Sequence, residues 1–277
     1  MKNQKFNKAL ASPYGPFIAM ALNILMAFVI YAIARLEFFF ENFGYFSNYI
    51  SLSLIGKWME GGYMFDRSAI AYTNALYIVL MLFPLWIKER RYYHLLCKWV
   101  FVVVNGLMFI INLCDSVYYP YTLRRTTTSV FHEFQNENNL GDVFWGEFLQ
   151  HWYLVILAVM VIWAMWKLFV MPQTQHTQYS TIKSKLRFGV VQLVFLLLTT
   201  PLVIVACRGG WSGDIRPITV NNANEYVQRP TECALVLNTP FAFIRTIGKD
   251  VFDVPNYYTD LDEAEKVFSP IHRPKSA

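Results

Sequence analysis

Seven charged residues stand near the ends of the apolar segments of this 277-residue chain, and their types are the best suited to binding chemistry. They are Asp66, Arg67, Asp115, Arg124, Arg125, Arg208 and Arg216. Guanidinium groups bind phosphate through charge-assisted hydrogen bonds, so arginines at this depth suit an anionic lipid headgroup. Charges at membrane depth also tend to pair with one another. The alternative interpretation is therefore that Asp66, Asp115, Arg124 and Arg208 form structural ion pairs that seal the end of a bundle.

No arrangement typical of an active site or a metal site is found in the sequence. The histidines are scattered, and His132-Glu133 is not followed by a second histidine at the spacing of a zinc protease. The sequence also lacks a phosphate-binding glycine loop and a Gly-x-Ser-x-Gly turn. We therefore predict that this chain by itself carries no catalytic residue, no metal ligand and no cofactor.

The composition is that of a polytopic membrane protein. Hydrophobic residues make up 55% of the chain and charged residues 16%, against about a quarter charged in soluble domains. The basic residues flank apolar segments and form no patch interleaved with stacking aromatics, which argues against nucleic acid as a partner. Membrane lipids are the expected partners.

Five segments have roughly the 20 apolar residues needed to cross a bilayer. They cover about residues 16–35, 68–87, 96–114, 150–171 and 187–207. The second is the least apolar, because Tyr72, Thr73 and Asn74 lie early in it. We predict an all-α membrane protein with five transmembrane helices.

The basic residues predict the orientation of these spans. Lys2, Lys5 and Lys8 precede the first span, and the second-to-third and fourth-to-fifth connections are also rich in Lys and Arg. The two other loops are rich in Asp and Glu. Because short basic loops stay in the cytoplasm, we expect a cytoplasmic N-terminus and an extracytoplasmic tail after Arg208.

Both acidic loops contain aromatic residues at helical spacing. Phe46, Ile50, Leu54 and Trp58 recur every fourth residue, with Tyr49 beside them, which predicts a helix lying along the membrane surface. The second loop predicts similar interfacial helices through aromatic anchors. These anchors are Phe131, Phe134, Phe144, Trp145 and Phe148. Alternatively, the aromatics of both loops simply plug the end of the bundle.

The chain divides into three predicted parts. Residues 1–207 form the five-span transmembrane domain, and residues 208–248 form short juxtamembrane helices that make a stalk. Within this stalk, Thr239 is suited to cap a helix with Pro240 at its first position. Residues 249–277 are too poor in apolar side chains to fold alone and are expected to be a linker.

Polar residues inside the spans allow a transport hypothesis. They are Asn23, Asn105, Asn112 and Gln192. Interhelical hydrogen bonds explain them equally well. No ionisable residue lies near the middle of a predicted span, which argues against an ion path.

Several motifs together resemble a known family. They are Arg208-Gly-Gly-Trp-Ser-Gly-Asp-Ile-Arg-Pro-Ile218, Asn238-Thr-Pro-Phe241, Ile244-Arg-Thr-Ile-Gly248, Phe65-Asp66, Asp115-Ser-Val-Tyr118 and Arg124-Arg-Thr126. With the five spans, they resemble the membrane half of lipoteichoic acid synthase-like proteins. These proteins belong to the phosphoglycerol transferase branch of the alkaline phosphatase/sulfatase superfamily.

The resemblance implies an anchor in a bacterial cytoplasmic membrane that carries an extracytoplasmic catalytic domain. In this family that domain uses a threonine nucleophile and a divalent metal, often manganese, to move glycerol phosphate from a phosphatidylglycerol-like lipid. We expect that domain to follow residues 249–277, so no catalytic residue is assigned here. The parent protein would be a metal-dependent transferase or a sulfatase-like hydrolase. The alternative is a stand-alone polytopic protein that binds lipid or transports a small solute.

Overall fold

The computed structural model describes residues 2–47, 50–84, 91–135, 140–172, 181–211, 217–248 and 267. The chain separates into two units, Met1–Ile247 and Gly248–Ala277. In the second unit only Gly248 and Val267 are described, so the predicted linker 249–277 lies almost entirely outside the described residues. Over the described residues the secondary structure is helical and contains no strand, which confirms the predicted all-α class.

The first unit contains long apolar helices and short helices between and after them. They are α1 (Lys2–Leu10), α2 (Gly15–Glu41), α3 (Phe43–Phe46), α4 (Leu52–Thr73), α5 (Ala75–Leu82), α6 (Arg91–Thr122), α7 (Val130–Gln135), α8 (Leu140–Gln150), α9 (Trp152–Leu168), α10 (Ile182–Arg208), η3 (Val220–Tyr226), η4 (Pro230–Glu232), α11 (Cys233–Val236) and α12 (Thr239–Thr246).

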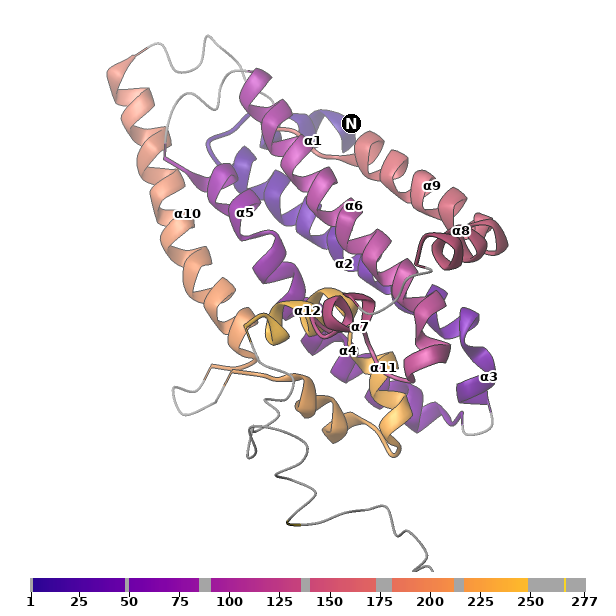
Figure 1. Ribbon diagram of the computed structural model, residues 1–277. Helices are drawn as coiled ribbons and strands as arrows, with labels where there is room; N and C mark the ends of the chain where they lie inside the picture. The colour runs from indigo at the N-terminus through magenta and orange to yellow at the C-terminus, as the bar shows by residue number, and fades with distance from the viewer. Residues whose placement is uncertain are drawn as a thin grey trace, which may run out of the picture. The chain divides into compact units, whose positions relative to one another are not determined.

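Helices α2 and α6 run side by side through the centre of the unit (Figure 1). Helix α9 packs on α6, and α10 packs on α4 and α5. The short helices α11 and α12 gather at one end, where α11 contacts α2 and α4 and α12 contacts α4 and α6. We call this the tail end of the bundle.

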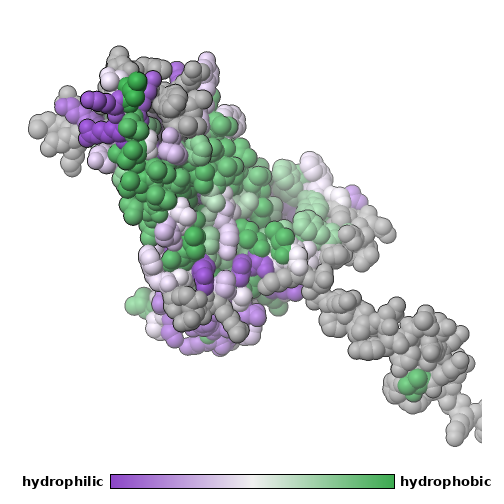
Figure 2. Space-filling view, turned by 90° about the vertical axis from the view of Figure 1, so that its left-hand side faces the viewer, coloured by the Kyte–Doolittle hydropathy of each residue, from purple (hydrophilic) through white to green (hydrophobic). Residues whose placement is uncertain are grey.

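Three helices, α2, α6 and α10, are long and apolar enough to cross a membrane. A fourth span results if α8 and α9 are counted together as one bent unit. Only 11% of the apolar window of α10 is buried inside the protein, so most of its side chains face outward. Figure 2 shows a hydrophobic belt on the side where α10 lies, with hydrophilic residues gathered at both of its ends. These features identify a membrane protein with three or four candidate spans, whereas the predicted five are not confirmed.

The predicted second span, residues 68–87, is not a single helix. Asn74 separates α4 from α5, and its backbone leaves helical geometry at φ −97° and ψ 8°. Its side-chain amide exchanges two hydrogen bonds with the Asn105 amide, of 3.1 and 2.8 Å. This pair makes the non-helical position favourable inside the bundle. Residues 85–87 of the prediction lie outside the described residues.

The predicted fourth span, residues 150–171, is shorter than expected and follows a sharp bend. Helix α9 has 17 residues, and α8 meets it at an angle of 76° at His151. Helix α8 is a helix in the predicted second loop, and its aromatic residues Phe144, Trp145 and Phe148 are exposed. Whether membrane lipid covers them stays a prediction.

The first predicted surface helix is part of a longer packed helix. Leu54 and Trp58 lie in the first half of α4 and are buried within the protein, as is Phe46 in α3. Ile50 is exposed, and Tyr49 lies outside the described residues. The apolar face of this segment is therefore covered largely by the protein itself, because α4 packs against α2, α10, α11 and α12.

Candidate functional site

The first part of the site is centred on Asp66 of α4, at the tail end. The Asp66 carboxylate accepts hydrogen bonds from Arg35 Nη2 at 2.5 Å and from Asn238 Nδ2 at 2.8 Å. Arg35 comes from α2 and also donates to the backbone carbonyls of Leu235 and Val236, the latter at 2.8 Å. One guanidinium therefore joins α2, α4 and the tail.

The second part is centred on Asp115 of α6. Its carboxylate accepts hydrogen bonds from Arg125 Nη1 at 3.0 Å, Thr239 Oγ1 at 2.7 Å and the backbone N–H of Thr126 at 2.9 Å. The Thr126 hydroxyl donates to the same carboxylate. Asp115 thus has four donors and, like Asp66, holds a residue of the tail.

Arg125 is enclosed on all sides. Its Nε donates to the Ala234 carbonyl at 2.8 Å, and its Cζ lies 3.5 Å from the centroid of the Phe38 ring. The side chain is 2% exposed, and that of Asp115 is 1% exposed. Burial lowers the pKa of the Arg125 guanidinium, and the Asp115 carboxylate opposes this by favouring the charged form. Arginine stays protonated in proteins, so the pair is a buried ion pair.

We call Arg35, Asp66, Asp115 and Arg125 the tail clamp. Each member except Asp66 also bonds to the backbone or hydroxyl of residues Ala234–Thr239, and Asp66 bonds to the Asn238 side chain. Removing one partner of such a buried pair strands a charge, which costs about 3–5 kcal/mol. The clamp therefore fixes the tail to the bundle.

Two glycines of α4 allow the tail and Arg35 to come this close. A Cβ at Gly61 would lie 2.6 Å from the Tyr226 ring and 2.7 Å from Val236. A Cβ at Gly62 would lie 2.8 Å from the Arg35 guanidinium carbon. Glycine costs about 0.5–1 kcal/mol in a helix interior, and here it makes room for the packed tail.

The turn after α6 separates two neighbouring arginines. Leu123 takes a positive φ of 53°, an unusual conformation for a large non-glycine residue. The Thr122 hydroxyl donates to the Arg124 carbonyl at 3.0 Å and supports the turn. The Arg125 side chain is buried within the tail clamp, whereas the Arg124 side chain is 59% exposed.

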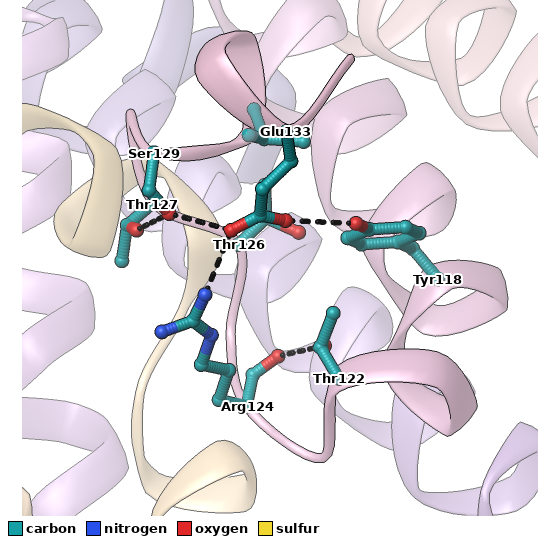
Figure 3. A pocket seen from close by; sticks show the side chains of 8 residues that line it. Tyr118, Thr122, Arg124, Thr126, Thr127, Ser129 and Glu133 are labelled. Carbon is teal, nitrogen blue, oxygen red and sulfur yellow. Dashed lines mark hydrogen bonds and ion pairs between the residues drawn. The ribbon is translucent and has the colours of Figure 1, made fainter. Parts of the chain in front are cut away.

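Arg124 lies in a shallow pocket formed by the end of α6, the following loop and α7 (Figure 3). We call this the hydroxyl pocket, and its lining residues are Tyr118, Thr122, Arg124, Thr126, Thr127, Ser129, Val130 and Glu133. The Glu133 carboxylate accepts from Arg124 Nη2 at 2.8 Å, Ser129 Oγ at 3.1 Å and the Tyr118 hydroxyl at 3.0 Å. The pocket thus contains an accessible ion pair surrounded by hydroxyl groups.

The predicted charged residues are brought together only in part. Arg67 donates to the Gly209 carbonyl at 3.1 Å, and among the described residues it forms no ion pair with a carboxylate. Arg208 ends α10, and its carbonyl accepts from the Ile218 N–H at 3.1 Å. Arg216 lies outside the described residues. Asp66, Asp115 and Arg124 are therefore all in ion pairs, but their partners are Arg35, Arg125 and Glu133 rather than one another.

Sequence reasoning did not assign Arg35, Asn238, Glu133 or the two glycines to a site, although Asn238 stands in one of the motifs that carry the resemblance. Arg35 was detectable as a charge at the end of the predicted first span. The cap of α12 was also misplaced by one residue. Asn238, and not Thr239, accepts the capping hydrogen bond from the Phe241 N–H at 2.8 Å. The Thr239 hydroxyl instead donates to Asp115.

The polar residues inside the spans form hydrogen bonds between segments. The Asn23 amide bonds to the Tyr77 hydroxyl at 2.7 Å and to both backbone groups of Val170 at 2.9 Å. Gln192 donates to the Pro13 carbonyl at 2.6 Å. Asn105 pairs with Asn74 as described above, and Asn112 accepts from the Thr239 N–H at 3.2 Å. The hydrogen-bonding interpretation of these residues is confirmed.

A scan against protein-family models and searches of curated proteins and of solved structures found no match. Within the described ranges, no group of three or more His, Cys, Asp or Glu residues could hold a metal ion. The geometry therefore offers two features for a function: a buried tail clamp and an exposed hydroxyl pocket.

Proposed function

We propose that this chain is the membrane module of a phosphoglycerol transferase-like or sulfatase-like enzyme and holds a catalytic domain beside its lipid substrate. The tail clamp is the observation that carries this proposal. A loose tail would need no buried ion pairs, whereas here four charged side chains from α2, α4, α6 and the loop after α6 hold six consecutive residues, Ala234–Thr239.

The mechanical consequence of the clamp is a fixed attachment point. With Thr239 tied to Asp115 and α12 capped by Asn238, the segment up to Ile247 belongs to the bundle. A domain attached after a short linker from such a point samples a small volume above the membrane. That restriction raises its effective concentration relative to lipid headgroups.

The proposal also includes the orientation of the chain in the membrane and the reaction of the attached domain. The basic connections favour a cytoplasmic N-terminus and an extracytoplasmic tail in a bacterial cytoplasmic membrane. The motifs between Arg208 and Gly248 support a relation to lipoteichoic acid synthase-like proteins. In that case the threonine nucleophile and a divalent metal such as manganese reside in the attached domain, and a phosphatidylglycerol-like lipid is the donor.

The first test reads the coding DNA past the codon for Ala277. We expect an open frame that encodes a Thr or Ser nucleophile and Asp and His metal ligands. The encoded full-length protein should transfer glycerol phosphate from phosphatidylglycerol in proteoliposomes when manganese is present. A stop codon, together with no sulfatase-like partner in the purified complex, would rule out the anchor proposal.

The second candidate function is a stand-alone lipid-binding protein, and the accessible Arg124–Glu133 pair favours it. Transport has weaker support, because the polar side chains inside the spans are engaged in hydrogen bonds between segments. Solute flux through proteoliposomes above the protein-free background would support transport instead.

A further inference from the structure

The hydroxyl pocket has binding capacity that its internal contacts do not use. Within the described part of the chain, the Arg124 guanidinium has a single hydrogen-bond partner, Glu133, through one nitrogen. Its remaining N–H groups are open to solvent, since the side chain is 59% exposed. The Glu133 side chain is 37% exposed and presents a carboxylate beside them. Both charges can therefore reach a ligand at the same time.

The pair of charges defines the chemistry that the pocket suits. A guanidinium fork binds a phosphate group through charge-assisted hydrogen bonds. The adjacent carboxylate repels a bare anion but accepts from a hydroxyl or ammonium group. Hence the matching ligand carries a phosphate next to a hydrogen-bond donor. A phosphate flanked by a trimethylated nitrogen has no such donor and should fit less well.

The surroundings of the pocket suit a lipid better than a free solute. The pocket lies at the end of α6, a candidate membrane span, and headgroups would be within reach if α6 crosses the bilayer. Large apolar side chains are exposed on α6, on the following loop, on α7 and on α8, and they are Tyr121, Leu123, Phe131 and Phe144. The Phe134 ring joins Tyr118 of the pocket to Phe144 of α8, at centroid distances of 5.8 and 5.7 Å. These side chains provide an apolar rim against which acyl chains can pack.

The pocket is also tied to the tail. Thr128, between two lining residues, donates its hydroxyl to the Thr246 carbonyl at 2.9 Å and its N–H to Thr246 Oγ1 at 3.2 Å. A ligand in the pocket would therefore sit beside the last turn of α12.

We propose that the hydroxyl pocket binds the headgroup of a membrane phospholipid, with the phosphate on Arg124 and a headgroup hydroxyl or ammonium donating to Glu133. This inference deepens the proposed function by naming a lipid site, and it rests on that function only in placing the tail end at a membrane face. It requires no attached catalytic domain.

The test measures binding of short-chain lipids to the purified 277-residue protein. The probes are dihexanoyl phosphatidylglycerol, phosphatidylethanolamine and phosphatidylcholine, with inorganic phosphate and glycerophosphoglycerol as soluble comparisons. We expect the first two lipids to bind about tenfold or more tightly than phosphatidylcholine, because only they donate to Glu133. Soluble phosphates should bind more weakly still, because they leave the apolar rim uncovered.

Variants separate the two charges. R124Q should weaken binding of phosphatidylglycerol and phosphatidylethanolamine about tenfold or more. R124K keeps the charge but loses the planar guanidinium, so its affinity for these lipids should lie between those of R124Q and the unmodified protein. E133A, which removes the acceptor oxygens, should remove the discrimination against phosphatidylcholine. K57Q, which removes an exposed cation of α4 outside the pocket, should bind like the unmodified protein.

Three results would overturn the inference. They are equal affinity for phosphatidylcholine in the unmodified protein, unchanged binding in a folded R124Q variant, and inorganic phosphate binding as tightly as the lipids. The last would assign the pocket to free phosphate. Because no catalytic domain is involved, any of these leaves the anchor proposal standing, and a stop codon after Ala277 would leave the lipid site standing.

Discussion

Arg124 and Arg125 are neighbours in the chain, yet they belong to two different regions of the molecule. Their ion pairs have similar lengths, 2.8 Å to Glu133 and 3.0 Å to Asp115. The Arg125 side chain is 2% exposed and has a ring and a backbone carbonyl as further partners, whereas that of Arg124 is 59% exposed. The length of an ion pair therefore says little about its role. Burial and the number of partners decide whether the pair holds the fold or is available to a ligand.

The largest effect on the free energy of unfolding should come from the buried Arg125–Asp115 pair. R125M leaves the Asp115 carboxylate buried without a cation and should destabilise the protein by about 3–5 kcal/mol. Thermal unfolding in detergent measures this, and limited proteolysis should release the tail. The double variant R125M/D115N should recover part of the loss, because it removes the stranded charge as well. An R125M variant as stable as R124Q would mean that the two regions do not differ.

The tail side of the clamp is tested at Asn238. N238A removes both the cap of α12 and a donor to Asp66, so we expect a loss of about 2 kcal/mol in unfolding free energy. N238S keeps a capping oxygen but cannot reach Asp66 in the same way, so it should lose about half as much. Equal stability of N238A and the unmodified protein would show that the clamp does not hold the tail.

A pair of glycines in α4 tests how closely the tail approaches the bundle. G61A places a methyl group against Tyr226 and should cost about 1–3 kcal/mol. G56A lies in the same helix with nothing within 4 Å of its Cβ, so it should instead stabilise by about 0.5–1 kcal/mol. The opposite signs are the prediction, read from the unfolding midpoints of the two variants. Stabilisation by both substitutions would mean that helix propensity alone governs these sites.

The smallest effect on stability should come from the exposed pair. R124Q breaks the bond to Glu133 but strands no buried charge, so the unfolding free energy should change by less than about 1 kcal/mol. The same unfolding assay used for R125M measures this difference. A larger loss would show that Arg124 supports the fold, and the hydroxyl pocket would then no longer contrast with the clamp.

Apolar length and helical spacing predicted the spans that became α2, α6 and α10, because these helices are uniformly apolar over enough residues. The helix after Asn238 was also predicted from its Thr-Pro start, although the capping residue was misplaced. Of the charged residues expected to form structural pairs, Asp66 and Asp115 each lie beside an arginine, but those arginines are Arg35 and Arg125 rather than the expected Arg124 and Arg208.

The remaining features depend on how helices face one another. The Arg35–Asp66 contact requires the relative rotation of α2 and α4, which periodicity does not specify. For the apolar face of residues 46–58, periodicity left two interpretations open, a helix on the membrane surface or a plug at the end of the bundle. Phe46, Leu54 and Trp58 are buried within the protein, as the second interpretation requires. The sequence could not decide because a hydrophobic stripe has the same spacing in both cases. The bend of 76° at His151 could not be predicted, because no proline or glycine lies beside it in the sequence.

The order of the tail-clamp residues in the chain predicts that the protein folds in two stages during its synthesis. Arg35 and Asp66 are 31 positions apart, and Asp115 and Arg125 are 10 apart. Asn238 comes 172 positions after Asp66, and Thr239 comes 124 after Asp115. At about 5–20 residues per second on the ribosome, each carboxylate meets its arginine many seconds before the tail is made. We expect a nascent intermediate in which both ion pairs are formed while Asp66 and Asp115 still lack their hydrogen bonds from Asn238 and Thr239. Brief protease treatment of ribosome-arrested chains would detect this intermediate. Docking of Ala234–Thr239 then completes the tail clamp, so this end of the bundle should be the last part to become protected from the protease.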